Sequence, residues 1–203
     1  MTPKPVLEVQ GSVSHRGEVL RLGTWKLGQG ETMLLTGGSP DLVARAFLGL
    51  EPNAEISVLG ARVGSREARS VLGIAFEEFS PMPSLKVLEH LALAVRVGPP
   101  RLGKVPPFRA VLGDVDLLSV ANEPAGRLDK AGRFRLSLAI MLVRLLPVWV
   151  VLAPSTFEPT VGVVERLQQA QMQGVGVVIY SDAEALRALS HQTRRLETKT
   201  AQD

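Results

Sequence analysis

The chain has 203 residues, of which 45% are hydrophobic and 21% charged. This composition is typical of a folded globular protein and excludes a disordered tail, a collagen-like fibre and a disulfide scaffold. Lysine and arginine exceed aspartate and glutamate by only three (23 − 20), the cations are scattered, and 4% of residues are aromatic, so we expect no nucleic-acid partner. There is no cysteine, and His15, His90 and His191 lie too far apart in the sequence to indicate a metal site.

The N-terminal third predicts short strands around one well-marked turn and helix. After a strand over residues 32–36 comes the sequence Gly37-Gly38-Ser39-Pro40-Asp41, and a helix follows over 42–50. Ser39 suits the N-cap position, Pro40 suits the first helical position, and Asp41 suits the first turn. The other strands expected here cover residues 7–13, 19–27, 56–59 and 71–76.

The remainder of the chain predicts a helical middle, followed by alternating strands and helices. Helices are expected over residues 84–95, 109–122, 133–146, 161–173 and 183–190, with a loop over 98–107 and an edge strand over 194–197. The runs 148–152 and 175–180 are continuously apolar, which is typical of strands buried on both faces of a parallel sheet. The pattern therefore indicates an α/β nucleotide-binding fold with a helical insert over about 84–146.

The apolar stretch Leu136–Pro154 requires a choice between a membrane span and two buried elements. Arg144 lies within the stretch, and Pro147 would interrupt a helix, whereas a span needs about 20 apolar residues. We therefore predict a buried helix followed by a buried strand. The start, Met1–Pro5, has no apolar signal-peptide core, so a cytoplasmic protein is expected.

Several segments, taken in order, resemble the nucleotide-binding subunit of ATP-binding cassette (ABC) transporters over about residues 6–197. The resemblance implies a P-loop NTPase-like ABC ATPase fold in one domain, residues 1–203, with a mixed β-sheet core over 6–83 and 147–197 and a helical subdomain over 84–146. The matching segments are Gly30-Glu31, Phe47–Leu50 after the first helix, Pro83–Leu91, Arg133–Ala139, Pro154-Ser155-Thr156 and Asp182–Leu186.

The resemblance places a phosphate-binding loop at Gly37, Gly38, Ser39 and Asp41, but its chemistry has changed. The family's loop reads G-x-x-x-x-G-K-[ST], in which backbone N–H groups and the lysine hold phosphates and the hydroxyl holds Mg²⁺. Here the loop is shorter, Pro40 stands at the lysine position, and Asp41 stands at the hydroxyl position. An ordinary capped helix start is the alternative interpretation, and nucleotide binding at these residues is at most vestigial.

The other catalytic positions implied by the resemblance are replaced as well. Glu77 stands at the Q-loop glutamine, and Leu128–Gly132 (Leu-Asp-Lys-Ala-Gly) stands at the signature motif. Leu152 replaces the Mg²⁺-associated aspartate, Ala153 the general-base glutamate, and Ser181 the switch histidine, while His15 is a weak match to the adenine-stacking aromatic. No replacement set appears, because Asp114 and Asp116 would not face each other on a helix and are expected on a solvated face. We therefore expect no ATPase activity and neither ATP nor Mg²⁺ as a cofactor.

The leading hypothesis is an ABC-type pseudo-ATPase that acts as a structural or regulatory subunit. The resemblance implies a partner-binding segment at Glu77, Glu78, Phe79, Met82 and Leu85, where apolar groups on an exposed loop are flanked by charge. The expected partners are a membrane permease subunit, an active ABC ATPase subunit, or a second copy, which would bring a cytoplasmic protein to the inner face of the membrane. Two alternatives remain open: a non-hydrolysing half that binds nucleotide weakly, and a stand-alone binding module. The apolar residues of the segment could equally seat the loop on its own domain.

Overall fold

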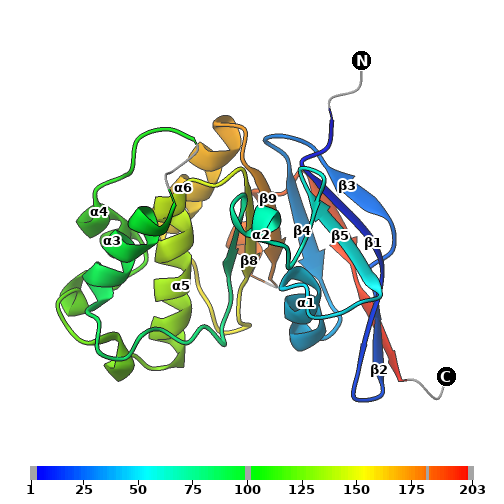
Figure 1. Ribbon diagram of the computed structural model, residues 1–203, viewed down its shortest axis with the longest axis horizontal. Helices are drawn as coiled ribbons and strands as arrows, with labels where there is room; N and C mark the ends of the chain where they lie inside the picture. The colour runs from blue at the N-terminus through cyan, green and yellow to red at the C-terminus, as the bar shows by residue number, and fades with distance from the viewer. Residues whose placement is uncertain (1–3, 99–101, 182, 201–203) are drawn as a thin grey trace.

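The strands divide between two sheets, so the mixed strand core expected from the sequence has an antiparallel and a parallel layer (Figure 1). The structure is a computed structural model that describes residues 4–98, 102–181 and 183–200. The antiparallel sheet has the order β11-β2-β1-β5-β6, with β3 also paired to β1. Its strands are β1 (Leu7–His15), β2 (Glu18–Arg21), β3 (Trp25–Leu27), β5 (Ala54–Val58), β6 (Ala61–Arg62) and β11 (Glu197–Thr200).

The second sheet is parallel throughout and forms the central layer. Its order is β10-β4-β9-β8-β7, and every neighbouring pair runs in the same direction. Along β8 the side chains of Trp149 and Val151 join one hydrophobic cluster, and those of Val148 and Val150 join another, so the strand is buried on both faces. The strands are β4 (Thr32–Thr36), β7 (Leu72–Ala75), β8 (Val148–Leu152), β9 (Gly176–Tyr180) and β10 (Gln192–Arg195).

Helices cover both faces of the parallel sheet. Residues of α1 (Pro40–Phe47) share a core with both sheets, whereas α5 (Lys130–Arg144) and α6 (Val161–Met172) belong to the core on the opposite face. The helices α3 (Val87–Val97) and α4 (Phe108–Asp114) pack with α5 in a helical lobe at one side of the molecule (Figure 1). The short elements are α2 (Arg66–Arg69), α7 (Glu184–Arg187) and the 3₁₀ turns Leu118–Val120 and Ala125–Arg127.

Two predicted elements are wrong because the backbone leaves its regular path. The strand expected over 19–27 is divided into β2 and β3, and Gly23 between them has a left-handed φ of 66°. The helix expected over 109–122 ends at Asp114, because Asp116 adopts a φ of 58° and the chain turns away. Part of the loop expected over 98–107, residues 99–101, lies outside the described residues.

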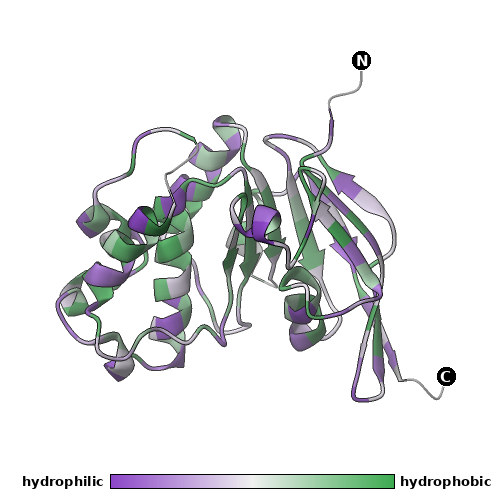
Figure 2. Ribbon diagram, viewed as in Figure 1, coloured by the Kyte–Doolittle hydropathy of each residue, from purple (hydrophilic) through white to green (hydrophobic). Residues whose placement is uncertain are grey.

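The apolar stretch around Arg144 is confirmed as a helix followed by a strand. α5 ends at Arg144, Leu145 takes a left-handed φ of 46°, and β8 begins at Val148. Figure 2 shows that hydrophobic residues concentrate on the central strands and are frequent along α5. Across residues 4–98, 102–181 and 183–200, no helix combines the length and the apolar content that crossing a bilayer requires.

Candidate functional site

The carboxyl ends of β4, β8 and β9 meet at one edge of the parallel sheet, which is where ligands bind in α/β folds. Leu35 and Leu152 are both register partners of Tyr180, from either side of β9. The Ala153 N–H donates to the Tyr180 carbonyl at 3.0 Å, and the Ser181 N–H donates to the Leu35 carbonyl at 3.3 Å. The structure therefore brings Leu152, Ala153 and Ser181 together, and each is no more than 6% exposed.

The glycine turn between β4 and α1 lies beside these strand ends. Gly37 and Gly38 have left-handed φ values of 70° and 74°, and Ser39 is the N-cap residue, although its side chain makes no capping hydrogen bond. The Tyr180 hydroxyl donates to the Gly38 carbonyl at 3.2 Å. A Cβ on Gly38 would lie 2.6 Å from the Leu20 side chain, so the turn lies closely against β2.

An open hollow of about 830 Å³ lies in front of the turn. Besides Gly37, Gly38 and Ser39, it is lined by the C-terminal strand segment and by Glu18. The charged residues around it alternate in sign, with Glu18 and Glu197 opposed to Arg195 and Lys199. The hollow therefore presents no continuous cationic surface for a polyphosphate.

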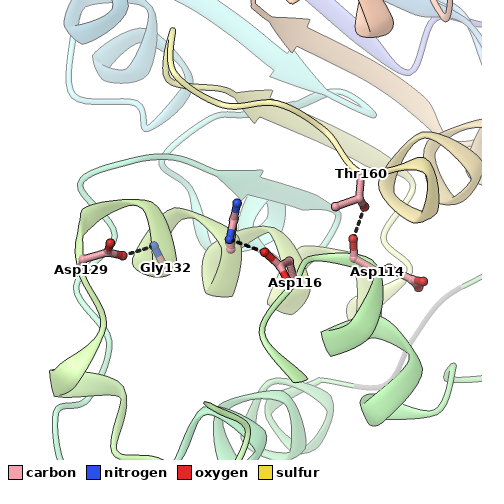
Figure 3. A network of polar contacts seen from close by, with 6 residues as sticks. Asp114, Asp116, Asp129, Gly132 and Thr160 are labelled. Carbon is pink, nitrogen blue, oxygen red and sulfur yellow. Dashed lines mark hydrogen bonds and ion pairs between the residues drawn. The ribbon is translucent and has the colours of Figure 1, made fainter. Parts of the chain in front are cut away.

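The segments expected to match the Q-loop and the signature motif contact each other. Glu77 follows β7, and its carboxylate lies 3.0 Å from the Lys130 ammonium at the start of α5. Asp129 is the N-cap of α5, and its carboxylate accepts a hydrogen bond of 2.7 Å from the Gly132 N–H (Figure 3). Both charged side chains of the altered signature segment thus have partners within the chain.

No family model and no curated protein matches the sequence. Solved structures do match: the ATP-binding subunit of an ABC transporter aligns with a TM-score of 0.74 at 18% identity, over 96% of this chain and 90% of its own. CbiO1 from Clostridium perfringens, part of the ABC transporter complex CbiONQ, aligns with a TM-score of 0.61 at 17% identity. The alignment covers 95% of this chain and 85% of CbiO1. A nucleotide-free ATP-binding cassette from an ABC transporter aligns with a TM-score of 0.65 at 14% identity, over 97% of this chain and 92% of its own. The chain has the ABC ATPase fold.

Within this ABC ATPase fold, the residues at the strand ends do not fit a Mg²⁺-bound triphosphate. Pro40 contributes neither a cationic side chain nor a backbone N–H. The exposed carboxylate of Asp41 stands in the first turn of α1, where a like charge about 4 Å away would cost about 4 kcal/mol at an effective dielectric constant of 20. The side chains of Leu152 and Ala153 offer no ligand for a metal and no base for water. Asp182, which follows Ser181, lies outside the described residues.

His15, the weak match to the adenine-stacking aromatic, does not line the hollow at the turn. It lies at the end of β1 opposite Glu18 of β2, and it is not among the residues that line the hollow. The resemblance-based assignment of His15 as a base-stacking residue thus gains no support from its position.

The segment Glu77–Leu85 is less exposed than the sequence suggests. Phe79 is half-buried, packs against the core of the helical lobe, and makes an edge-on contact with Phe76 at a ring distance of 6.3 Å. Leu85 is also half-buried, and of the three apolar side chains only Met82 is well exposed, at 48%. The expectation of three exposed apolar groups is therefore wrong for Phe79 and Leu85, because the loop packs on its own domain.

His90 holds this segment in place, a role that sequence reasoning missed. It is 4% exposed, its Nε2 accepts a hydrogen bond of 3.1 Å from the Met82 N–H, and its Nδ1 lies 2.9 Å from the Lys86 carbonyl. These contacts correspond to a neutral ring protonated at Nδ1. The only sequence signal was a histidine on the apolar side of a helix, four residues after Lys86.

Asp114 does not lie on a solvated face as expected. Its carboxylate pairs with the Arg166 guanidinium at 2.7 Å, and its backbone carbonyl accepts a hydrogen bond from the Thr160 hydroxyl (Figure 3). Asp116 pairs with Arg135 at 2.9 Å and is well exposed. The two aspartates therefore have separate structural partners, and the Asp114 contacts join the helical lobe to the start of α6.

Proposed function

We propose that this chain is a catalytically inactive member of the ABC ATPase fold that acts as a structural or regulatory subunit of an ABC transporter-like complex. The observation that carries the proposal is the content of the edge where β4, β8 and β9 end. Leu152, Ala153 and Ser181 are buried together there, and the resemblance assigns to them the positions at which hydrolysis would need carboxylates and an imidazole.

The expected loss of catalytic rate is large enough to favour an inactive protein over a slower enzyme. Removing one preorganised electrostatic group typically lowers a rate by ~10²–10³, and removing a general base by ~10²–10⁴. These losses are not additive, because the groups act as one unit. Here, however, the positions that the resemblance assigns to phosphate, metal and base are all replaced, which supports loss of the whole unit.

The alternative is a subunit that binds nucleotide without hydrolysing it, and a direct measurement of ATP binding distinguishes it from a subunit that binds none. Asp41 opposes an anion at the start of α1, and Pro40 removes one N–H donor. Lys130, the one cation in the altered signature segment, is paired with Glu77. These observations favour a subunit that does not depend on ATP over a non-hydrolysing half that binds it.

Calorimetric titration with ATP, with and without Mg²⁺, tests this proposal together with a phosphate-release assay. We expect no binding at micromolar affinity and no turnover above background. Ala153→Glu should restore nothing, because the phosphate and metal positions stay altered. Turnover that Ser181→Ala or Asp41→Ala abolishes would refute inactivity, and ATP affinity in the micromolar range or tighter would refute the loss of nucleotide binding.

We assign binding of a partner subunit to the segment Glu77–Leu85. CbiO1, which shares the fold, is part of a transporter complex. We infer a membrane subunit or an active ATPase subunit as partner for this chain, with Met82 as the exposed apolar contact. Co-purification from the native cell should recover that partner, and Met82→Asp should weaken recovery, whereas the same change at exposed Met172 should not. Equal recovery with both variants would remove the segment from the interface.

A further inference from the structure

Arg144, the last residue of α5, has a guanidinium group without a partner. Its Nε is buried and makes no hydrogen bond, and the ion pairs found in the described part of the chain do not include Arg144. Burial lowers the pKa of this guanidinium from its usual value, because the charged form loses hydration. A buried N–H donor that has no acceptor costs free energy, and an anion at this position would recover part of it.

Arg144 is one of the residues that line a pocket of about 300 Å³ with mainly apolar walls. One wall is the end of α1 with Phe47 and Leu48, and another is β7 with Leu72 and Ile74. β7 is one of the two edge strands of the parallel sheet, so the pocket lies where the sheet ends. The remaining lining residues are Gly64, Ala68 and Arg69.

The charge of this pocket is positive, and no acid lines it. Arg69, the second cation, is exposed and donates to the Gly64 carbonyl at 2.8 Å, so it is held at the pocket. A guanidinium recognises a carboxylate through parallel N–H donors, and such bonds strengthen where water is excluded. The apolar walls would in turn bury a hydrocarbon group.

We propose that the pocket around Arg144 binds a small monocarboxylate that carries an apolar group. Its volume is at the low end of ligand pockets, which span ~300–1,000 Å³, so the ligand is small. A dianionic phosphate fits less well, because most of the lining is hydrocarbon and could not replace its hydration. The pocket shares no lining residue with the hollow at Gly37–Ser39, so this inference is independent of the proposed loss of ATPase activity.

The test uses hexanoate as the probe, titrated calorimetrically into the full chain, with hexanamide as the neutral isostere and inorganic phosphate as the competing anion. We expect hexanoate to bind, and hexanamide and phosphate to bind at least about tenfold more weakly. Arg144→Met should weaken hexanoate binding about tenfold to a hundredfold, the usual effect of losing a charge-assisted hydrogen bond. Arg144→Lys should have a smaller effect, because it keeps the charge at the end of α5 and loses only the forked donors.

Arg62→Met is the matched control, since Arg62 is exposed and does not line this pocket. It should leave hexanoate affinity unchanged, and methyl resonances of Leu72 and Ile74 should shift on binding to the wild-type chain. The Arg144→Met variant should melt no lower than wild type, because it removes a buried N–H donor that has no acceptor. Absence of hexanoate binding, equal binding of hexanamide, tighter binding of phosphate, or full affinity in Arg144→Met would each overturn the proposal. If Arg144→Met does not fold, Arg144→Lys decides the question. Hexanoate affinity equal to that of the wild type in Arg144→Lys would then overturn the proposal.

Discussion

Gly162, in the first turn of α6, is a position where alanine should destabilise the protein despite its higher helix propensity. A Cβ built there would lie 2.6 Å from the Asp114 Oδ1, 2.9 Å from its Cβ and 3.0 Å from its Cα. The last atom belongs to the backbone of α4, so the clash cannot be relieved by rotating a side chain. α4 and α6 would have to separate, which would also strain the Asp114–Arg166 ion pair.

The magnitude follows from two opposing effects. Replacing glycine with alanine inside a helix gains up to about 1 kcal/mol, whereas overpacking a tight contact typically costs about 1–3 kcal/mol. We therefore expect Gly162→Ala to lower the free energy of unfolding by about 1–2 kcal/mol. For a chain of this size that corresponds to a fall of about 2–8 °C in melting temperature.

Gly113, exposed in α4, supplies the matched control. A Cβ on Gly113 meets nothing within 4 Å, so Gly113→Ala should gain up to about 1 kcal/mol. Urea unfolding of both variants, followed by circular dichroism, measures the two effects in the same protein. If Gly162→Ala proved as stabilising as Gly113→Ala, the close approach of α4 and α6 would be wrong.

Two further pairs of variants test contacts described above. Asp129→Ala should lower the free energy of unfolding by about 1 kcal/mol because it removes an N-cap hydrogen bond, whereas Ser39→Ala should change it by only a few tenths because Ser39 makes none. Phe79→Asp should lower it by about 1–3 kcal/mol and reduce the melting temperature, since Phe79 packs on the core, whereas Met82→Asp should stay within about 0.5 kcal/mol. Equal effects within either pair, measured by thermal and urea unfolding, would contradict the corresponding contact.

Elements with a continuous apolar pattern could be predicted well from the sequence. β4 and β8 occupy the expected residues 32–36 and 148–152, because strands buried on both faces leave an uninterrupted hydrophobic run. The breaks were not predictable, since no hydrophobic period marks the left-handed backbone of Asp116 or of Gly23. β6 and α2 were missed because each is too short to show a period.

In the candidate site, features that follow from the strand pattern could be predicted, whereas contacts between residues far apart in the sequence could not. Parallel strands bring their carboxyl ends together, so the proximity of Leu152 and Ser181 is implied once the strands are assigned. The Glu77–Lys130 and Asp114–Arg166 pairs join residues more than 50 positions apart, and no local pattern marks them. The exposure of Phe79 was wrongly predicted because the two glutamates before it, Glu77 and Glu78, indicate an exposed loop. Its ring nevertheless packs against the core.

The position of β4 in the parallel sheet has a consequence for synthesis of the chain on the ribosome. Both neighbours of β4 come from the C-terminal part, with Met33 paired to Val178 on one side and to Gln192 on the other. Val178 follows Met33 by 145 positions, so at about 5–20 residues per second it is added about 7–29 s later. During that interval the apolar β4 has no strand to pair with, while the helices of the lobe, whose contacts are local, can already form. The nascent chain therefore exposes an aggregation-prone strand until β9 has been made, and its yield in cells should depend on chaperones that bind extended apolar segments.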